Sequence, residues 1–297
     1  MTFQTLRTGS VRRAALAVAV AALVACVPAP EEPEDEGIPV FDIETAMGQI
    51  QASERIIIGV DATLPPLSFL DERGRVTGLA VELGELIAEG LGVQPVYRMG
   101  STDALLEGIG VGLIDVAFPA TPITEQMLRS IRFSDPYYVA HQRLLVPRDS
   151  EMREVEDLGG RTVCSSIHPE TGVALDELDE TIRVQPVDAA EECRQPLLRG
   201  TVDAATGPDL FLFGLDAPGF LVAGDQLSTE GYGVAVRGSA AFSGFVDGVF
   251  ADAREHGRWQ EIFERWLGRH SDQDFSLPPP LTVEEAAALF PADPADG

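Results

Sequence analysis

From Arg55 onward, short apolar runs alternate with amphipathic stretches of helical length. Arg55–Val60 predicts a buried strand, and Leu79–Leu91 predicts a helix that ends at Gly92. This alternation is typical of α/β domains, in which helices connect parallel strands, so we predict an α/β fold. Further strands are predicted at 95–97, 114–118, 143–146, 161–165, 183–187, 202–206 and 232–236, and further helices at 102–110, 189–198 and 243–267.

The charge of the chain excludes several kinds of function. It carries 48 acidic residues against 21 basic ones, all of them arginine, for a net charge of −27. Without lysine there is no Walker A phosphate loop, no pyridoxal Schiff base and no Ser-x-x-Lys acyl transferase. Because nucleic-acid binding depends on cations that neutralise phosphates, we expect no nucleic-acid partner.

The first residues are typical of a bacterial export signal. A basic stretch precedes Ala14–Ala25, a run of twelve apolar residues that is too short to span a bilayer. The run ends in Leu23-Val24-Ala25-Cys26, which resembles the lipobox of bacterial lipoproteins. We therefore predict a lipoprotein signal peptide at 1–25, lipidation of Cys26, and an extracytoplasmic protein anchored to the membrane through its lipid. A buried N-terminal helix is the alternative, and an acidic, proline-rich spacer is predicted at 26–39.

Two cysteines remain once Cys26 is assigned to the lipobox. Cys164 and Cys193 form an even pair in an oxidising compartment, where a disulfide is the usual outcome. Two free buried thiols are the alternative. We favour the disulfide because both positions fall in the same predicted subdomain.

A series of short motifs runs through residues 59–268: Gly59-Val60-Asp61, Leu64–Phe69, Ile123-Thr124, Phe133–Tyr137, Asp157–Val163, Gly200–Ala204, Tyr232–Val234 and Trp266–Gly268. In this order the segment from Ile56 to Gly268 resembles a family 3 extracellular solute-binding protein, the receptor of polar amino-acid ABC importers. The resemblance implies a two-lobed, type II periplasmic-binding-protein-like fold with two hinge strands, which closes on a small-molecule solute. It also implies an ABC permease as partner and a monomeric protein.

The resemblance divides the chain into two lobes. Lobe one is expected at 40–142 plus 233–297, and lobe two at 143–232. The chain is expected to cross between the lobes near Gln142–Pro147 and Glu230–Val236.

The resemblance also implies ligand contacts, although several positions depart from the family pattern. The family's carboxylate-binding arginine is replaced by Met127, and the loop before it contains Pro119 and Pro122, which have no N–H to donate. These changes favour a ligand that is less polar, or cationic without being zwitterionic; in the cationic case Asp61, Glu170 and Asp209 would hold the charge. The predicted ligand-binding residues are Asp61, Leu64, Thr121, Thr124, Met127, Ser165, Thr171 and Asp209.

Two other functions stay open. A cleft that no longer binds would suit a sensor or interaction lipoprotein. An enzyme on the same fold is the weaker alternative, because His168 beside Glu170 is the only suggestive acid–base pair. We therefore expect no catalytic residue, no cofactor and no metal.

Overall fold

The computed structural model describes residues 37–167, 172–215, 218–268 and 281–291. The described residues from 38 onward form one compact unit. The predicted signal peptide, Cys26, Thr171 and the His168–Glu170 pair lie outside the described residues.

The first sheet has five strands in the order β5 (Gln94–Met99), β1 (Arg55–Val60), β6 (Val116–Phe118), β15 (Ala235–Val236) and β7 (Arg132–Phe133). Strand β1 is parallel to β5 and β6, whereas β15 is antiparallel to its neighbours. Ile56, Ile58 and Val60 are fully buried in one cluster, while Ile57 packs into another. Successive strand side chains point to opposite faces, so helices cover both sides of this sheet.

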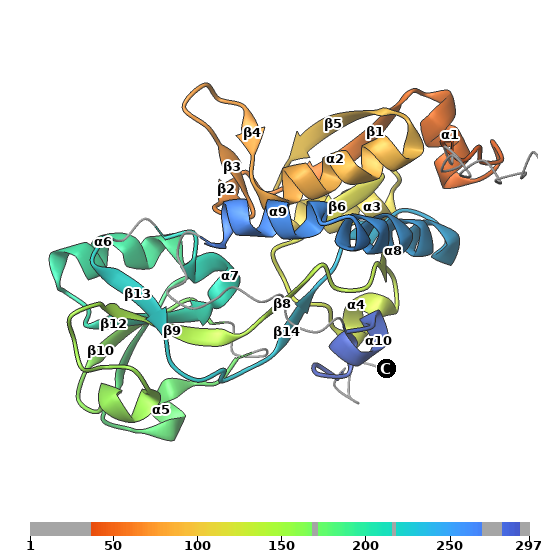
Figure 1. The fold of residues 1–297 in the computed structure, drawn as a ribbon. Helices are drawn as coiled ribbons and strands as arrows, with labels where there is room; N and C mark the ends of the chain where they lie inside the picture. Colours follow the sequence, from red (N-terminus) through yellow and green to blue (C-terminus); the bar gives the residue numbers. More distant parts are fainter. Residues whose placement is uncertain (1–36, 168–171, 216–217, 269–280, 292–297) are drawn as a thin grey trace, which may run out of the picture. The chain divides into compact units, whose positions relative to one another are not determined.

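Helices α2 (Leu79–Leu91), α8 (Ala240–Glu255) and α9 (Arg258–Trp266) contact one another and share a buried cluster with Ile58. Figure 1 shows the three helices packed together. Helix α3 (Thr102–Gly110) contacts β1 and β6 and supplies Leu105 and Ile109 to the other cluster. Helix α10 (Val283–Ala287) joins that cluster through Ala286 and Ala287. This sheet and its helices are the first lobe. The remaining elements of this lobe are α1 (Ala46–Ala52), β2 (Thr63–Leu64), β3 (Ser68–Leu70), β4 (Val76–Thr77) and α4 (Glu125–Leu128).

The second sheet repeats the parallel centre of the first. Its order is β11 (Arg183–Pro186), β10 (Thr162–Ser165), β12 (Ala204–Pro208), β9 (Gln142–Pro147) and β13 (Phe220–Ala223). Strand β10 is parallel to β11 and β12, and β9 is antiparallel to β12 and β13. This sheet and its helices are the second lobe. Its helices are a 3₁₀ turn at Val155–Leu158, α5 (Leu175–Leu178), α6 (Glu191–Arg199) and α7 (Asp209–Leu212).

The predicted α/β, two-lobed fold is confirmed, and one pair of strands connects the sheets. Strand β8 (Tyr138–Ala140) pairs antiparallel with β14 (Glu230–Tyr232), and the two lie side by side between the lobes in Figure 1. Gln142–Pro147, which the sequence placed at the crossing, is a full member of the second sheet.

Two element predictions were wrong in detail. The helix expected at 243–267 is two helices, because Gly257 adopts a left-handed φ of 78° between α8 and α9. The strand expected at 232–236 is divided into β14 and β15, which belong to different sheets. In both cases the apolar pattern continues across the point where the chain changes direction, so the pattern alone does not indicate the break.

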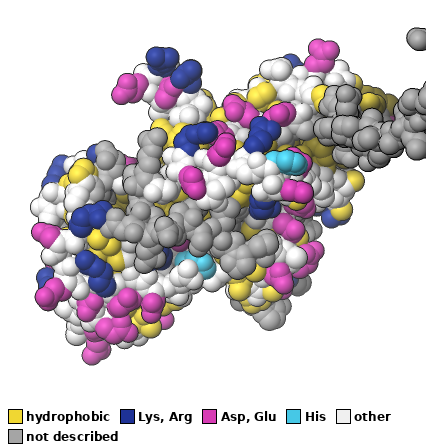
Figure 2. Space-filling model, viewed as in Figure 1, with side chains coloured by type: hydrophobic (Ala, Val, Ile, Leu, Met, Phe, Trp, Pro, Cys, Tyr) yellow, Lys and Arg dark blue, Asp and Glu magenta, His cyan; other side chains and the backbone are white. Residues whose placement is uncertain are grey.

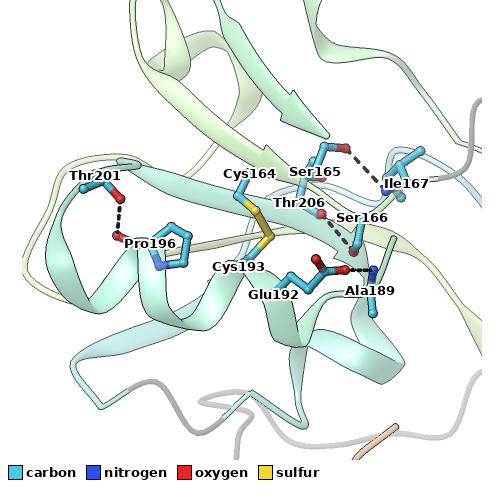
Figure 3. The surroundings of a disulfide bond; sticks show 10 residues. All are labelled: Cys164, Ser165, Ser166, Ile167, Ala189, Glu192, Cys193, Pro196, Thr201 and Thr206. Atoms are coloured by element: carbon cyan, nitrogen blue, oxygen red, sulfur yellow. Dashed lines mark hydrogen bonds between the residues drawn. A yellow bond between two sulfur atoms is a disulfide. The ribbon is translucent and has the colours of Figure 1, made fainter. Parts of the chain in front are cut away.

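The predicted disulfide is present and lies in the core of the second lobe. Cys164 and Cys193 have Cα atoms 5.7 Å apart and join β10 to α6, as Figure 3 shows. Cys164 is fully buried and Cys193 is 1% exposed. The bond therefore holds helix α6 against the second sheet.

Replacing both cysteines by alanine is expected to lower the free energy of unfolding by about 3 kcal/mol, because the bond closes a loop of 29 residues in the unfolded chain. Urea titration of the oxidised protein and the Cys164→Ala/Cys193→Ala variant measures this difference. As a control, reductant should leave the midpoint of the variant unchanged. Equal midpoints for the two oxidised proteins would contradict the expectation.

Candidate functional site

A cavity of about 600 Å³ is lined by residues from both lobes. Its first-lobe walls come from the segments after β1 and β6, and its second-lobe walls from the segments after β10, β11 and β12. These are the carboxyl ends of the parallel strands, where open α/β sheets bind ligands. The lining residues are Asp61, Thr63, Leu64, Pro65, Thr102, Ala120, Thr121, Pro122, Thr124, Gln126, Met127, Ser166, Asp188, Ala189, Ala190, Glu191, Pro208, Phe211, Glu230 and Tyr232.

Five of the predicted ligand-binding residues lie together on the first-lobe side of this cavity: Asp61, Leu64, Thr121, Thr124 and Met127. Thr124 caps α4, and its hydroxyl accepts the N–H of Met127 at 3.2 Å. The cap places the first turn of this short helix, and with it the Met127 side chain, at the cavity wall.

The Asp61 carboxylate shapes its own loop. Its Oδ1 accepts the Thr63 N–H at 3.1 Å and the Thr63 hydroxyl at 2.7 Å. This is an Asx-type turn, which orders the chain between β1 and β2. Part of the hydrogen-bonding capacity of Asp61 is therefore used within the loop, although a carboxylate oxygen can accept more than one bond.

Two predicted residues, Ser165 and Asp209, are not among the described residues that line the cavity. Ser165 is 8% exposed within β10, and the next residue, Ser166, lines the cavity instead. Asp209 is 5% exposed, and its Oδ1 accepts the Tyr138 hydroxyl and the His141 N–H, each at 3.2 Å. Pro208 occupies the cavity wall in its place. Thr171 lies outside the described residues.

Glu230 is a lining residue that the sequence prediction missed. It belongs to β14, is 1% exposed, and its Oε2 accepts the Tyr232 hydroxyl at 2.8 Å. Burial raises the pKa of Glu230 to about 7, and hydrogen bonds from Tyr232 and Ser228 act in the opposite direction.

The cavity also has aromatic walls that the sequence prediction missed. The rings of Phe211 and Tyr232 are edge to face, with centroids 5.9 Å apart. Phe211 comes from α7 of the second lobe, and Tyr232 comes from β14 between the lobes. No motif marks Phe211, and the motif at Tyr232–Val234 was not assigned to ligand binding, because the two rings meet only when α7 packs against the connecting strands.

The described residues on the face drawn in Figure 2 show no concentrated cationic surface. On the described part of the face in Figure 2, arginines are scattered among carboxylates. Within the described ranges, no group of three or more His, Cys, Asp or Glu residues is placed to hold a metal ion. A search of the same residues finds no helix of the length and hydrophobicity needed to cross a bilayer.

Comparison with known proteins identifies the class to which this fold and cavity belong. Residues 56–269 match the bacterial extracellular solute-binding proteins, family 3, and the chain belongs to that family. Members of the family are extracellular or periplasmic, bind small amino-acid solutes and work with ABC transporters.

The individual relatives have low sequence identity, but the match covers most of the length of each relative. The chain is 26% identical to the L-cystine-binding protein TcyJ of Escherichia coli K12 over 234 residues, which are 77% of this chain and 88% of TcyJ. It is 24% identical to an L-arginine-binding protein of Pseudomonas aeruginosa PAO1 over 230 residues, 73% of this chain and 89% of that protein.

Solved structures agree with the fold. A mutant of ArgBP from T. maritima is 30% identical, with a TM-score of 0.60, over 75% of this chain and all of that chain. The ancestral cationic amino acid solute-binding protein AncCDT-1 has a TM-score of 0.69 at 22% identity, over 75% of this chain and all of its own, and shows the fold alone.

Proposed function

We propose that this chain captures a small polar or amino-acid-like solute in the cavity by closure of its lobes and delivers it to an ABC importer. The observation that carries the proposal is the cavity itself, because its walls come from the strand ends of both lobes. A ligand that contacts both lobes favours the closed form over the open one, and a permease can distinguish the two forms.

The proposed moving parts are lobe one, 40–142 plus 233–297, and lobe two, 143–232. The connecting strands β8 and β14 are the proposed hinge, since they form the paired segment between the two sheets. A lipid on Cys26 would keep the protein at the membrane beside its permease. We further propose that the ligand is not a standard amino acid, because Met127 and Pro122 line the first-lobe wall.

A thermal-shift screen tests the proposed function. We expect at least one compound among amino acids, amines, betaines, short peptides and aromatic acids to raise the unfolding midpoint of the purified protein at micromolar concentration, because a ligand that binds only the folded chain stabilises it by mass action. If a standard zwitterionic amino acid is the best ligand, the proposal of a non-standard ligand is contradicted. No stabilising compound in any class would contradict solute binding and favour the sensor or interaction lipoprotein.

The enzyme alternative is related to one structural comparison by its fold. AncCDT-1 is also described as a precursor of cyclohexadienyl dehydratase, and that structure matches at 23% identity with a TM-score of 0.63. At this identity the match shows the fold alone. An enzyme would consume the stabilising compound, so chromatography of the compound after incubation separates the two functions.

A further inference from the structure

Four carboxylates line the cavity, and one of them, Glu191, pairs with Arg194 of its own helix at 3.9 Å. Asp61, Asp188, Glu191 and Glu230 line it from three segments of the chain, and no arginine or histidine is among its described lining residues. A cavity with one sign of charge raises the local concentration of ligands of the other sign. The charge of this wall therefore favours cations.

Several positions of the wall lack a free backbone donor for a ligand carboxylate, although hydroxyl side chains such as Thr121 and Ser166 also line it. Pro65, Pro122 and Pro208 have no N–H, and the Ala120 N–H donates to the Thr102 hydroxyl at 3.2 Å. Without an arginine among the described lining residues, the paired donors that best bind a carboxylate are missing there.

Helix α6 presents its N-terminal end to the cavity, and acidic side chains lie at this end. The carboxylate of Glu192 accepts the Ala189 N–H at 3.0 Å, as Figure 3 shows, and Glu191 is also in the first turn. Acidic side chains at this position offset the positive end of the helix. An external anion therefore gains little from α6.

Glu230 offers a cation both a charge and aromatic faces. Among the described residues no arginine lies within ion-pair distance of Glu230, and its Oε2 accepts only the Tyr232 hydroxyl. The rings of Phe211 and Tyr232 line the same cavity, and aromatic faces attract ammonium groups. The sequence predicted that Asp209 would hold a cationic ligand. Its Oδ1 instead accepts hydrogen bonds from the Tyr138 hydroxyl and the His141 N–H.

We propose that the cavity binds an organic cation that carries no carboxylate, and that Glu230 with Phe211 and Tyr232 holds its cationic group. This inference rests on the proposed function, because it assigns the ligand class of the same cavity. The apolar remainder of the wall, including Leu64, Pro122 and Met127, would contact the carbon skeleton of the ligand.

Pairs of compounds that differ in a carboxylate test the ligand class. Isothermal titration calorimetry of the purified protein would compare agmatine with arginine, and choline with glycine betaine. We expect the carboxylate-free member of at least one pair to bind a hundredfold more tightly than its partner. Equal or tighter binding of the carboxylated members would overturn the ligand class and leave the proposed function standing. No binding by any of the four would also overturn it, whereas only an empty thermal-shift screen would overturn the proposed function.

Glu230→Gln tests the assigned residue, because glutamine keeps the shape and the acceptor for Tyr232 but removes the charge. We expect the variant to bind agmatine or choline at least tenfold more weakly. Glu255→Gln, which removes the same charge from the exposed face of α8, should bind as the wild type does. Equal affinity of the Glu230→Gln variant and wild type would overturn the assignment.

The pH dependence of binding gives a second readout. Burial raises the pKa of Glu230 to about 7, so the affinity of the wild type should increase as the pH rises through this value. The hydroxyls of Tyr232 and Ser228 hydrogen-bond the Glu230 carboxyl group. Tyr137 and Asp209 lie near Tyr232, and the His141 ring contacts the Ser228 carbonyl. The increase should be absent in Glu230→Gln; an equal increase in the variant would assign the titration to another group and overturn the role of Glu230.

Discussion

Acidification from pH 8 to pH 5 is expected to stabilise the folded chain by several kcal/mol. Burial raises the pKa of Asp209 to about 7 and that of Glu230 to about 7, from ordinary values of 3.8 and 4.5. Between these values the folded state binds protons that the unfolded state has released, so stability is gained as the pH falls. Each group contributes about 2 kcal/mol or more over this range, since one unit of pKa corresponds to about 1.4 kcal/mol.

Other groups alter this expectation in known directions. Burial also raises the pKa of Asp247 to about 6, which adds to the stabilisation. Burial lowers the pKa of His141, so stability is lost as the pH falls through its ordinary value of 6.5. The destabilising contribution comes from one half-buried imidazole, that of His141. The stabilising contributions come from Asp209 and Glu230, which are at most 5% exposed, so acidification increases the free energy of unfolding overall.

Urea titrations at pH 5 and pH 8 measure the difference in unfolding free energy. Asp209→Asn and Glu230→Gln should each raise the stability at pH 8 and reduce the pH dependence, while Glu255→Gln should change neither. A protein that is equally stable at both pH values, or variants that keep the full dependence, would show that these carboxyl groups are not buried as described.

The element pattern was predictable wherever local signals agreed. Leu79–Leu91 is a helix with the predicted bounds, because its apolar face ends at Gly92, which takes the left-handed conformation with φ of 69°. The short strands β2, β3 and β4 escaped prediction, since two or three residues carry no periodicity.

The candidate site was predictable only in the first lobe. There the motif around Ile123-Thr124 places Thr121, Thr124 and Met127 on one loop, and all three line the cavity. In the second lobe a shift of one residue changes which side chain reaches the cavity, so Ser166 and Pro208 lie where Ser165 and Asp209 were expected.

Glu230 could not be predicted, because its position depends on pairing between distant segments. It lies opposite Ala140 in the β8–β14 pair, 90 residues away in the chain. In sequence it is one glutamate among 48 acidic residues, and nothing local distinguishes it from a solvated one. Its burial becomes evident only from the contacts between the two connecting strands.

Gly214→Ala is expected to weaken ligand binding by tenfold to a hundredfold while leaving each lobe folded. Gly214 follows α7 of the second lobe, and a Cβ at this position would overlap the backbone carbonyl of Pro65 and the Cδ of Pro66 in the first lobe. Pro65 also lines the cavity. Relieving the overlap requires the lobes to separate, and overpacking of this kind costs about 1–3 kcal/mol. That cost falls on the closed form, so it appears as lost affinity.

Calorimetric titration with agmatine and choline measures the affinity, and thermal unfolding checks that the variant is folded. Gly244→Ala is the matched control, because nothing lies within 4 Å of a Cβ at that position in α8, and it should keep full affinity. Gly to Ala inside a helix is stabilising by up to about 1 kcal/mol, so the control should unfold at the same or a higher temperature. Unchanged affinity in Gly214→Ala would show that the contact between Gly214 and Pro65 is absent from the ligand-bound form. Closure would then bring the lobes together along a different surface.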